Sequence, residues 1–159
     1  MQDNATDHPD VITFPPLIYL AGMGLSLAAK LLWRMPITPK WLGRPRRKAG
    51  VALIAAGAGM AIWGARTFQE AGTNVSPHEP ASALVEDGPY QFTRNPIYIG
   101  AAAAYSGVTL LFNNLWGFVL LPGVLAVVQR GVIEREEAYL RATFGGAYDE
   151  YTERIPRWL

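Results

Sequence analysis

The sequence predicts an all-α, polytopic membrane protein: a bundle of about four transmembrane helices with a C-terminal helix extension. Half of its 159 residues are hydrophobic and only 17% are charged, below the roughly 25% that is typical of soluble domains. The charges are also segregated, because the stretches 12–29, 49–65 and 97–128 contain no Lys, Arg, Asp or Glu. A helix needs about 20 predominantly apolar residues to cross a bilayer, and the first two stretches are close to that length.

The third stretch is too long for one span. Its 32 residues would form a helix of roughly 48 Å, against a hydrocarbon core of about 30 Å. Asn113 and Asn114 lie at its midpoint, and asparagine favours turns. We therefore expect two helices joined by a tight turn, which brings the two sequences flanking the stretch to the same membrane face.

The expected spans are roughly 12–33, 49–68, 96–112 and 115–130, with the last helix continuing to about Phe144. Acidic rather than basic residues precede the first span, so we interpret it as a retained helix and not as a signal peptide. The length fits a single domain, 1–159. Its segments 69–95 and 131–159 carry most of the polar motifs.

Small residues dominate the second helix and recur at Ala101–Ala104 and Gly107 on the third. Such residues let helix backbones approach closely in lipid, which predicts packing within the bundle. Pro122 predicts a kink in the fourth helix.

Composition excludes several kinds of site. The chain has no cysteine and only two histidines, so disulfides, cysteine-ligated metals and a histidine-rich metal centre are excluded and no metal is expected. No basic stripe indicates nucleic acid. The sequence also lacks a Ser-His-Asp set, a P-loop and a dinucleotide glycine fingerprint.

The helix after the fourth span carries one glutamate without an obvious partner. Glu134 can pair with Arg130, and Glu137 with Arg141, at helical spacing. Glu136 has only apolar or aromatic neighbours three and four positions away, so it is expected to face the bundle. Ionisable residues that face a membrane interior are candidates for function.

The alternative for Glu136 is a structural link to Arg94 or Arg154 from another segment. Both interpretations can hold together.

The start of the third helix is the second candidate. Asn95 suits the N-cap position and Pro96 the first helical position. Capping does not explain Arg94, and an arginine at a helix N-terminus attracts anionic groups. His78, in the loop before it, is either a proton carrier or a hydrogen-bonding loop residue.

The order and spacing of these motifs resemble the isoprenylcysteine carboxyl methyltransferase family, which is similar to the phospholipid N-methyltransferases. The resemblance covers about residues 68–159. It rests on Gly72-Thr73, Leu84-Val85-x-x-Gly88-Pro89-Tyr90, Arg94-Asn95-Pro96-x-Tyr98-x-Gly100, Glu136-Glu137-x-x-Leu140, Phe144-Gly145-x-x-Tyr148-x-x-Tyr151 and Pro156-Arg157.

The resemblance implies a small helical membrane bundle that binds S-adenosylmethionine near the cytosolic surface. It implies catalytic roles for Arg94 and Glu136. The cofactor-binding set that it implies is His78, Leu84, Val85, Gly88, Tyr90, Arg94, Asn95, Pro96, Tyr98, Glu136, Glu137, Tyr148 and Tyr151. Carboxylates suit the positive sulfonium and ammonium groups of this cofactor, arginine suits its carboxylate, and aromatic rings suit its adenine.

Two positions depart from the family pattern. Many members have histidine where Asn95 stands, and the eukaryotic isoprenylcysteine enzymes have histidine where Ser82 stands. The acceptor is therefore left open between a carboxylate, a thiol, an amine and a lipid head group. Access from the membrane lipid favours a lipophilic or small-molecule acceptor.

The expected location is a bacterial inner membrane with the site facing the cytosol, where the cofactor is made. The basic residues of 34–48 favour the opposite orientation, but the tally of basic residues on the two faces is nearly even. Two alternative functions are a membrane reductase of the sterol-reductase type that uses NADPH and a non-catalytic protein that keeps the fold. The sequence indicates no oligomeric state.

Overall fold

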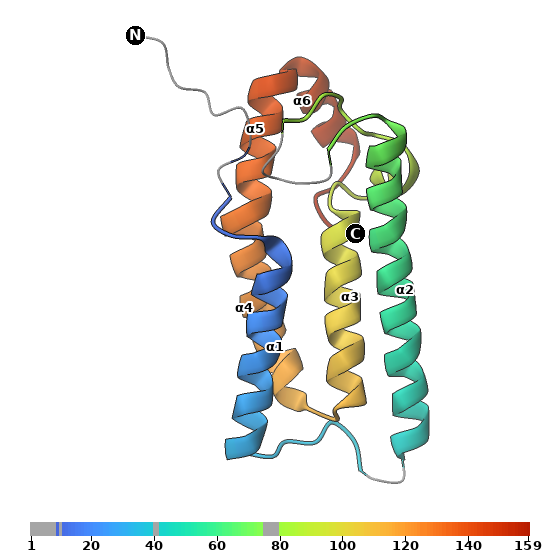
Figure 1. The fold of residues 1–159 in the computed structure, drawn as a ribbon, viewed down its shortest axis with the longest axis vertical. Coiled ribbons are helices and arrows are strands. Elements are labelled where there is room, and N and C mark those ends of the chain that lie inside the picture. The colour runs from blue at the N-terminus through green and yellow to red at the C-terminus, as the bar shows by residue number, and fades with distance from the viewer. Residues whose placement is uncertain (1–8, 10, 40–41, 75–79) are drawn as a thin grey trace.

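The computed structural model describes residue 9 and residues 11–39, 42–74 and 80–159, and all regular elements among them are helical. Four long helical segments run side by side (Figure 1). They are α1 (Pro15–Leu32), α2 (Gly43–Glu70), α3 (Pro96–Leu111) and an unbroken segment made of α4 (Leu115–Val128), the π-helical turn η3 (Gln129–Ile133) and α5 (Glu134–Phe144). A short 3-10 helix, η2 (Gly88–Gln91), precedes α3, and α6 (Gly146–Arg154) follows α5.

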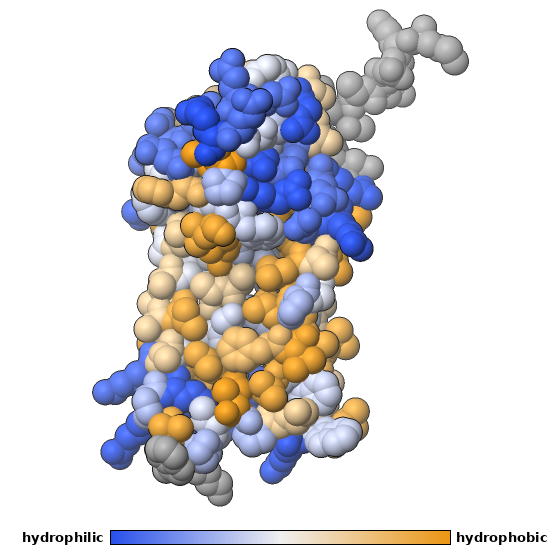
Figure 2. All heavy atoms as spheres, turned by 180° about the vertical axis from the view of Figure 1, so that it is seen from behind, coloured by the Kyte–Doolittle hydropathy of each residue, from blue (hydrophilic) through white to orange (hydrophobic). Residues whose placement is uncertain are grey.

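Helix length and composition confirm the all-α, polytopic membrane class. The helices Pro15–Leu32, Gly43–Glu70 and Leu115–Phe144 are long and apolar enough to cross a membrane, and α3 is a shorter apolar helix of 16 residues. On the face shown in Figure 2, apolar side chains cover the middle of the molecule and polar side chains gather toward its two ends. This distribution is the one that a bilayer imposes on a helical bundle.

The helix connections fall at two opposite ends of the bundle (Figure 1). The α1–α2 connection and the α3–α4 turn lie at one end. The α2–α3 loop, α5 and α6 lie at the other end, so the polar motifs of the sequence gather there.

The α3–α4 turn is fixed by the paired asparagines. Asn113 adopts a left-handed backbone with a φ of 49°, a conformation that asparagine tolerates better than most residues. Its side-chain oxygen accepts hydrogen bonds from the backbone N–H groups of Ile37 and Thr38, at 2.9 and 3.0 Å. Asn114 is buried and donates to the carbonyl of Ser26 at 3.0 Å. The turn is therefore tied to both the α1–α2 connection and α1.

Helices α2 and α3 pack with their backbones in contact, at glycines spaced seven residues apart on each helix. A Cβ added to Gly100 would lie 2.5 Å from the carbonyl oxygen of Gly57, and one added to Gly107 would lie 2.5 Å from that of Gly50. Only glycine permits this approach, as the small-residue pattern predicts.

The helix ends differ in part from the expected ranges. Helix α2 begins at Gly43, six residues before the stretch 49–65 that lacks charged residues. Its basic first turns can stay helical because they lie at the membrane surface. One of these residues, Arg46, donates to the carbonyl of Leu111 at 3.1 Å. Charge patterning marks the edge of the apolar span and not the end of the helix.

Candidate functional site

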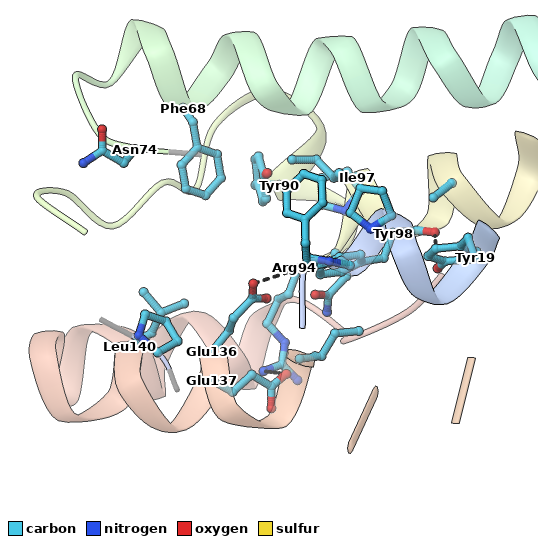
Figure 3. Close-up of a pocket in the computed structure, with 18 of the residues that line it drawn as sticks. Tyr19, Phe68, Asn74, Tyr90, Arg94, Ile97, Tyr98, Glu136, Glu137 and Leu140 are labelled. Atoms are coloured by element: carbon cyan, nitrogen blue, oxygen red, sulfur yellow. Dashed lines mark hydrogen bonds and ion pairs between the residues drawn. The ribbon is translucent and has the colours of Figure 1, made fainter. Parts of the chain in front are cut away.

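A cavity of about 660 Å³ lies between α1 and α3 and extends to α5 and the α2–α3 loop. The lining includes a polar and aromatic set of residues, several of which are labelled in Figure 3, and an apolar set. The polar part is lined by Asn74, Tyr90, Arg94, Asn95, Tyr98, Glu136, Glu137, Tyr139 and Tyr148. The apolar part is lined by Phe14, Pro15, Pro16, Leu20, Met23, Ala101, Ala104 and Val108.

Most of the residues implied by the resemblance line this cavity. They are Tyr90, Arg94, Asn95, Pro96, Tyr98, Glu136, Glu137 and Tyr148. Four others do not line it: Leu84, Val85, Gly88 and Tyr151. His78 lies outside the described residues.

The start of α3 is held by the C-terminal tail. Asn95 occupies the N-cap position and Pro96 the first helical position, but the Asn95 side chain does not cap the helix. Its amide donates instead to the carbonyl of Arg157 at 3.0 Å, and the Thr93 hydroxyl donates to the same carbonyl at 3.0 Å. This bond orients the Asn95 side chain toward the tail, and its oxygen accepts no capping bond from the first turn of α3.

Glu137 is neutralised by two guanidinium groups. Its carboxylate lies 3.0 Å from Arg94 and accepts two hydrogen bonds from Arg157, at 2.9 and 2.6 Å. The bonds to this carboxylate raise the pKa of Arg157 above its ordinary value. The expected pair of Glu137 with Arg141 is wrong: α6 folds back onto α5 and brings Asp149 within 2.7 Å of Arg141. Glu137 pairs instead with Arg94 and Arg157, which come from other segments.

The expected pair of Glu134 with Arg130 is also wrong. Glu134 accepts a hydrogen bond from Gln129 at 3.1 Å and lies 3.7 Å from Arg157. The wide turn before α5 changes the spacing on which that pairing depended.

Glu136 differs from both neighbouring glutamates. It accepts a hydrogen bond from the Tyr98 hydroxyl at 2.8 Å, and no described residue forms an ion pair with it (Figure 3). The alternative links to Arg94 and Arg154 are wrong, because Arg94 pairs with Glu137 and Arg154 with Glu86. Glu136 therefore presents an uncompensated carboxylate to the cavity, an arrangement that favours a cationic ligand.

Arg94 has one unused donor. Its Nη1 pairs with Glu137, but its Nε is buried without a hydrogen-bond partner. Buried donors are nearly always bonded in folded proteins. This N–H can therefore donate a hydrogen bond to an anionic or carbonyl group of a ligand in the cavity that Glu136 also lines.

Aromatic rings flank these charges. The rings of Phe68 and Tyr90 lie 5.1 Å apart, edge to face, and the Tyr151 hydroxyl donates to the Tyr90 carbonyl at 2.9 Å. Burial raises the pKa of Tyr90, and the nearby Tyr151 and Glu136 raise it further. Tyr90 is therefore a neutral phenol that can stack on a planar ligand group and donate a hydrogen bond.

Some lining residues could not be identified from the sequence. Tyr19 donates to the carbonyl of Tyr98 at 3.1 Å, but it belongs to the first helix, which carries no motif. Phe68 and Tyr139 have no distinguishing spacing. Arg157 is not part of the lining but bonds Glu137, which is; it belongs to a motif of the resemblance, yet this contact depends on how the tail folds.

Comparison with known proteins identifies the family. The sequence profile described as phospholipid methyltransferase matches residues 45–147, about two thirds of the chain. The chain belongs to the phospholipid methyltransferase family. This membership confirms the resemblance expected from the motifs, which linked the isoprenylcysteine and phospholipid enzymes.

One curated relative matches part of the chain. The Protein-S-isoprenylcysteine O-methyltransferase of Schizosaccharomyces pombe (strain 972 / ATCC 24843) is 36% identical over 73 residues, which are 46% of this chain and 31% of the relative. The chain therefore spans about a third of the length of that relative. No solved structure matches the chain.

Proposed function

We propose that the chain is an integral membrane methyltransferase that uses S-adenosylmethionine and methylates a lipophilic or small-molecule acceptor. The observation that carries this proposal is that one cavity is lined both by Glu136, whose carboxylate has no ion-pair partner among the described residues, and by Arg94, whose Nε is a buried donor without a partner. The proposal treats residues 1–159 as a single domain, whose segments 69–95 and 131–159 form the donor site.

The polar part of the cavity fits the charges of this methyl donor. Glu136 can bind its ammonium or sulfonium group, and Arg94 Nε can bind its carboxylate. Tyr90 and Phe68 offer ring faces for adenine. Glu137 supports Arg94 through their ion pair and has no free charge to offer a ligand.

The apolar part of the cavity suits the acceptor. It runs along α3 from Tyr98 to Val108, ten residues or roughly 15 Å of helix. Phe14 and Leu20 line it and are more than half exposed, at 53% and 66%. In a bilayer these side chains face lipid, so a lipophilic acceptor can reach the cavity without crossing water.

The chemistry requires positioning more than acid or base groups. When bound, S-adenosylmethionine supplies a methyl group that is already activated on its sulfonium sulfur. The chain has to hold donor and acceptor in line and exclude water, and such positioning is a large part of catalysis in two-substrate reactions. Arg94 and Glu136 are the residues that we assign to this role.

We also propose that the site faces the cytosol, in a bacterial inner membrane. The donor is made in the cytosol, and the polar residues that line the cavity come mainly from α5, from the α2–α3 loop and from the start of α3, which lie toward one end of the bundle. The basic α1–α2 connection is then external. A reporter fused after Leu159 should read as cytosolic, and an external reading would exclude this orientation.

The test is to incubate the purified protein with labelled S-adenosylmethionine and with prenylcysteine, thiol, amine and lipid acceptors. We expect labelled product from one acceptor class, lost in Glu136→Gln and kept in Glu134→Gln, because Glu134 lies outside the cavity lining. A parallel arm tests NADPH binding. NADPH binding with no labelled product would favour a reductase and overturn the proposal.

A further inference from the structure

The turn that precedes Glu136 is wider than an α-helical turn. The backbone N–H of Glu134 donates to the carbonyl of Gln129, five residues back, so Gln129–Ile133 forms a π-helical turn. Such turns insert one extra residue into an α-helix. The turn lies inside the continuous helical segment that carries Val124 and Val128 before it and Glu136 after it.

The extra residue determines which way Glu136 points. Val124 and Val128 are buried in the core that also contains Tyr19 and Tyr105. Eight residues separate Val128 from Glu136, and in an uninterrupted α-helix they would rotate Glu136 roughly 80° past the face of Val128. Because the wide turn takes up one residue, the rotation is that of seven residues, which leaves Glu136 within roughly 20° of that face.

The N-terminal segment holds this turn from outside. The backbone N–H of Ile12 donates to the carbonyl of Gly131, inside the turn, at 3.1 Å. A Cβ added to Gly131 would lie 2.7 Å from Ile12 Cγ1 and nearer still to Cδ1. The adjacent Val11 is buried with Val128 and Val132. The end of the Ile12 side chain therefore occupies the space that a larger residue at position 131 would need.

We propose that Ile12 is a positioning residue for Glu136. It packs on Gly131 and bonds its carbonyl, which holds the π-helical turn and with it the direction of the Glu136 carboxylate. The inference rests on the proposed function, because it assigns Glu136 to donor binding. It adds that the segment before α1, far away in the sequence, controls the donor site.

A cross-linking experiment tests the geometry without any ligand. The chain has no cysteine, so Tyr98→Cys with Glu136→Cys gives one pair of thiols at positions whose native side chains are hydrogen-bonded. A short bifunctional thiol reagent should join them efficiently. Deletion of Arg130, which removes the extra residue and rotates α5 by about 100°, should abolish the cross-link.

Three substitutions then locate the control at Ile12. Gly131→Ala and Ile12→Ala should each lower the cross-linking yield. The double variant should restore it, because the new methyl group fills the space that the shorter side chain leaves and the backbone hydrogen bond from position 12 remains. Gly123→Ala, on the same helix with no neighbouring atom within 4 Å of the added Cβ, is the matched control and should change nothing. An unchanged yield in either single variant, or a loss that the double variant does not reverse, would overturn the inference.

Donor affinity gives the functional readout in the same variants without the cysteines. Gly131→Ala should raise the Kd for S-adenosylmethionine about fivefold, in the range of couplings carried by packed side chains. The Ile12→Ala, Gly131→Ala double variant should return to near the wild-type value. A wild-type protein that binds no donor would overturn the proposed function, whereas a cross-linking pattern without reversal would overturn only the role of Ile12.

Discussion

Glu136 and Glu137 are adjacent in the sequence, but their contacts differ, since Glu137 pairs with two arginines and Glu136 accepts a hydrogen bond from Tyr98. Glu137 is 8% exposed and holds Arg94 and Arg157 through three contacts of 2.6–3.0 Å. Glu137→Gln keeps the size of the side chain but removes the anion that pairs with Arg94 and leaves Arg157 only its longer contact with Glu134, at 3.7 Å. Removing one partner of a buried pair costs about 3–5 kcal/mol, and because Arg157 is 31% exposed we expect about 3 kcal/mol.

A loss of this size should lower the thermal unfolding midpoint by roughly 6–12 °C for a chain of this length. The assay is thermal unfolding of the purified protein in one detergent, followed by circular dichroism. Glu136→Gln is the matched control, because Glu136 has no cationic partner among the described residues. Its midpoint should stay within about 2 °C of wild type, the change expected for less than 1 kcal/mol. Equal midpoints in the two variants would refute the division of roles.

Three further substitutions test the fold and the site. Gly57→Ala places a methyl group against the backbone of Gly100 and should destabilise the bundle by about 1–3 kcal/mol. Gly59→Ala is the control, because its added methyl group has open space around it, and equal unfolding midpoints for the two variants would contradict the close packing. Asn113→Ala loses the side-chain hydrogen bonds of the α3–α4 turn and strains its left-handed backbone, so it should lower the unfolding free energy by about 2–3 kcal/mol. An unchanged unfolding midpoint would contradict the importance of these bonds. Arg94→Ala should weaken donor binding by about 1.5–3 kcal/mol in calorimetry, and an unchanged Kd would exclude Arg94 from the donor site.

Much of the fold could be predicted from the distribution of charge. The stretch 97–128 is too long for one span, and the asparagine pair at its midpoint is where the chain turns back. This turn brings the start of α3 and the start of α5 to the same end of the bundle (Figure 1). The prediction succeeded because the bilayer imposes a length limit that a sequence reveals directly.

The pairing of individual charges could not be predicted in the same way. Spacing along one helix suggested a partner for Glu137 at Arg141, but the actual partners come from the start of α3 and from the tail. Such contacts depend on how distant segments pack against each other, and the spacing of residues along one helix does not reveal that packing. The π-helical turn was missed for a related reason, because counting at 3.6 residues per turn assumes that the helix is regular.

The most direct test of the account is the affinity of the purified protein for S-adenosylmethionine, measured by calorimetry in wild type, Glu136→Gln and Glu134→Gln. We expect the wild type and Glu134→Gln to bind the donor with similar Kd values. Glu136→Gln should bind it at least about tenfold more weakly, because it loses a charge-assisted contact worth about 1.5–3 kcal/mol. An unchanged Kd in Glu136→Gln would contradict the claim that this uncompensated carboxylate binds the donor.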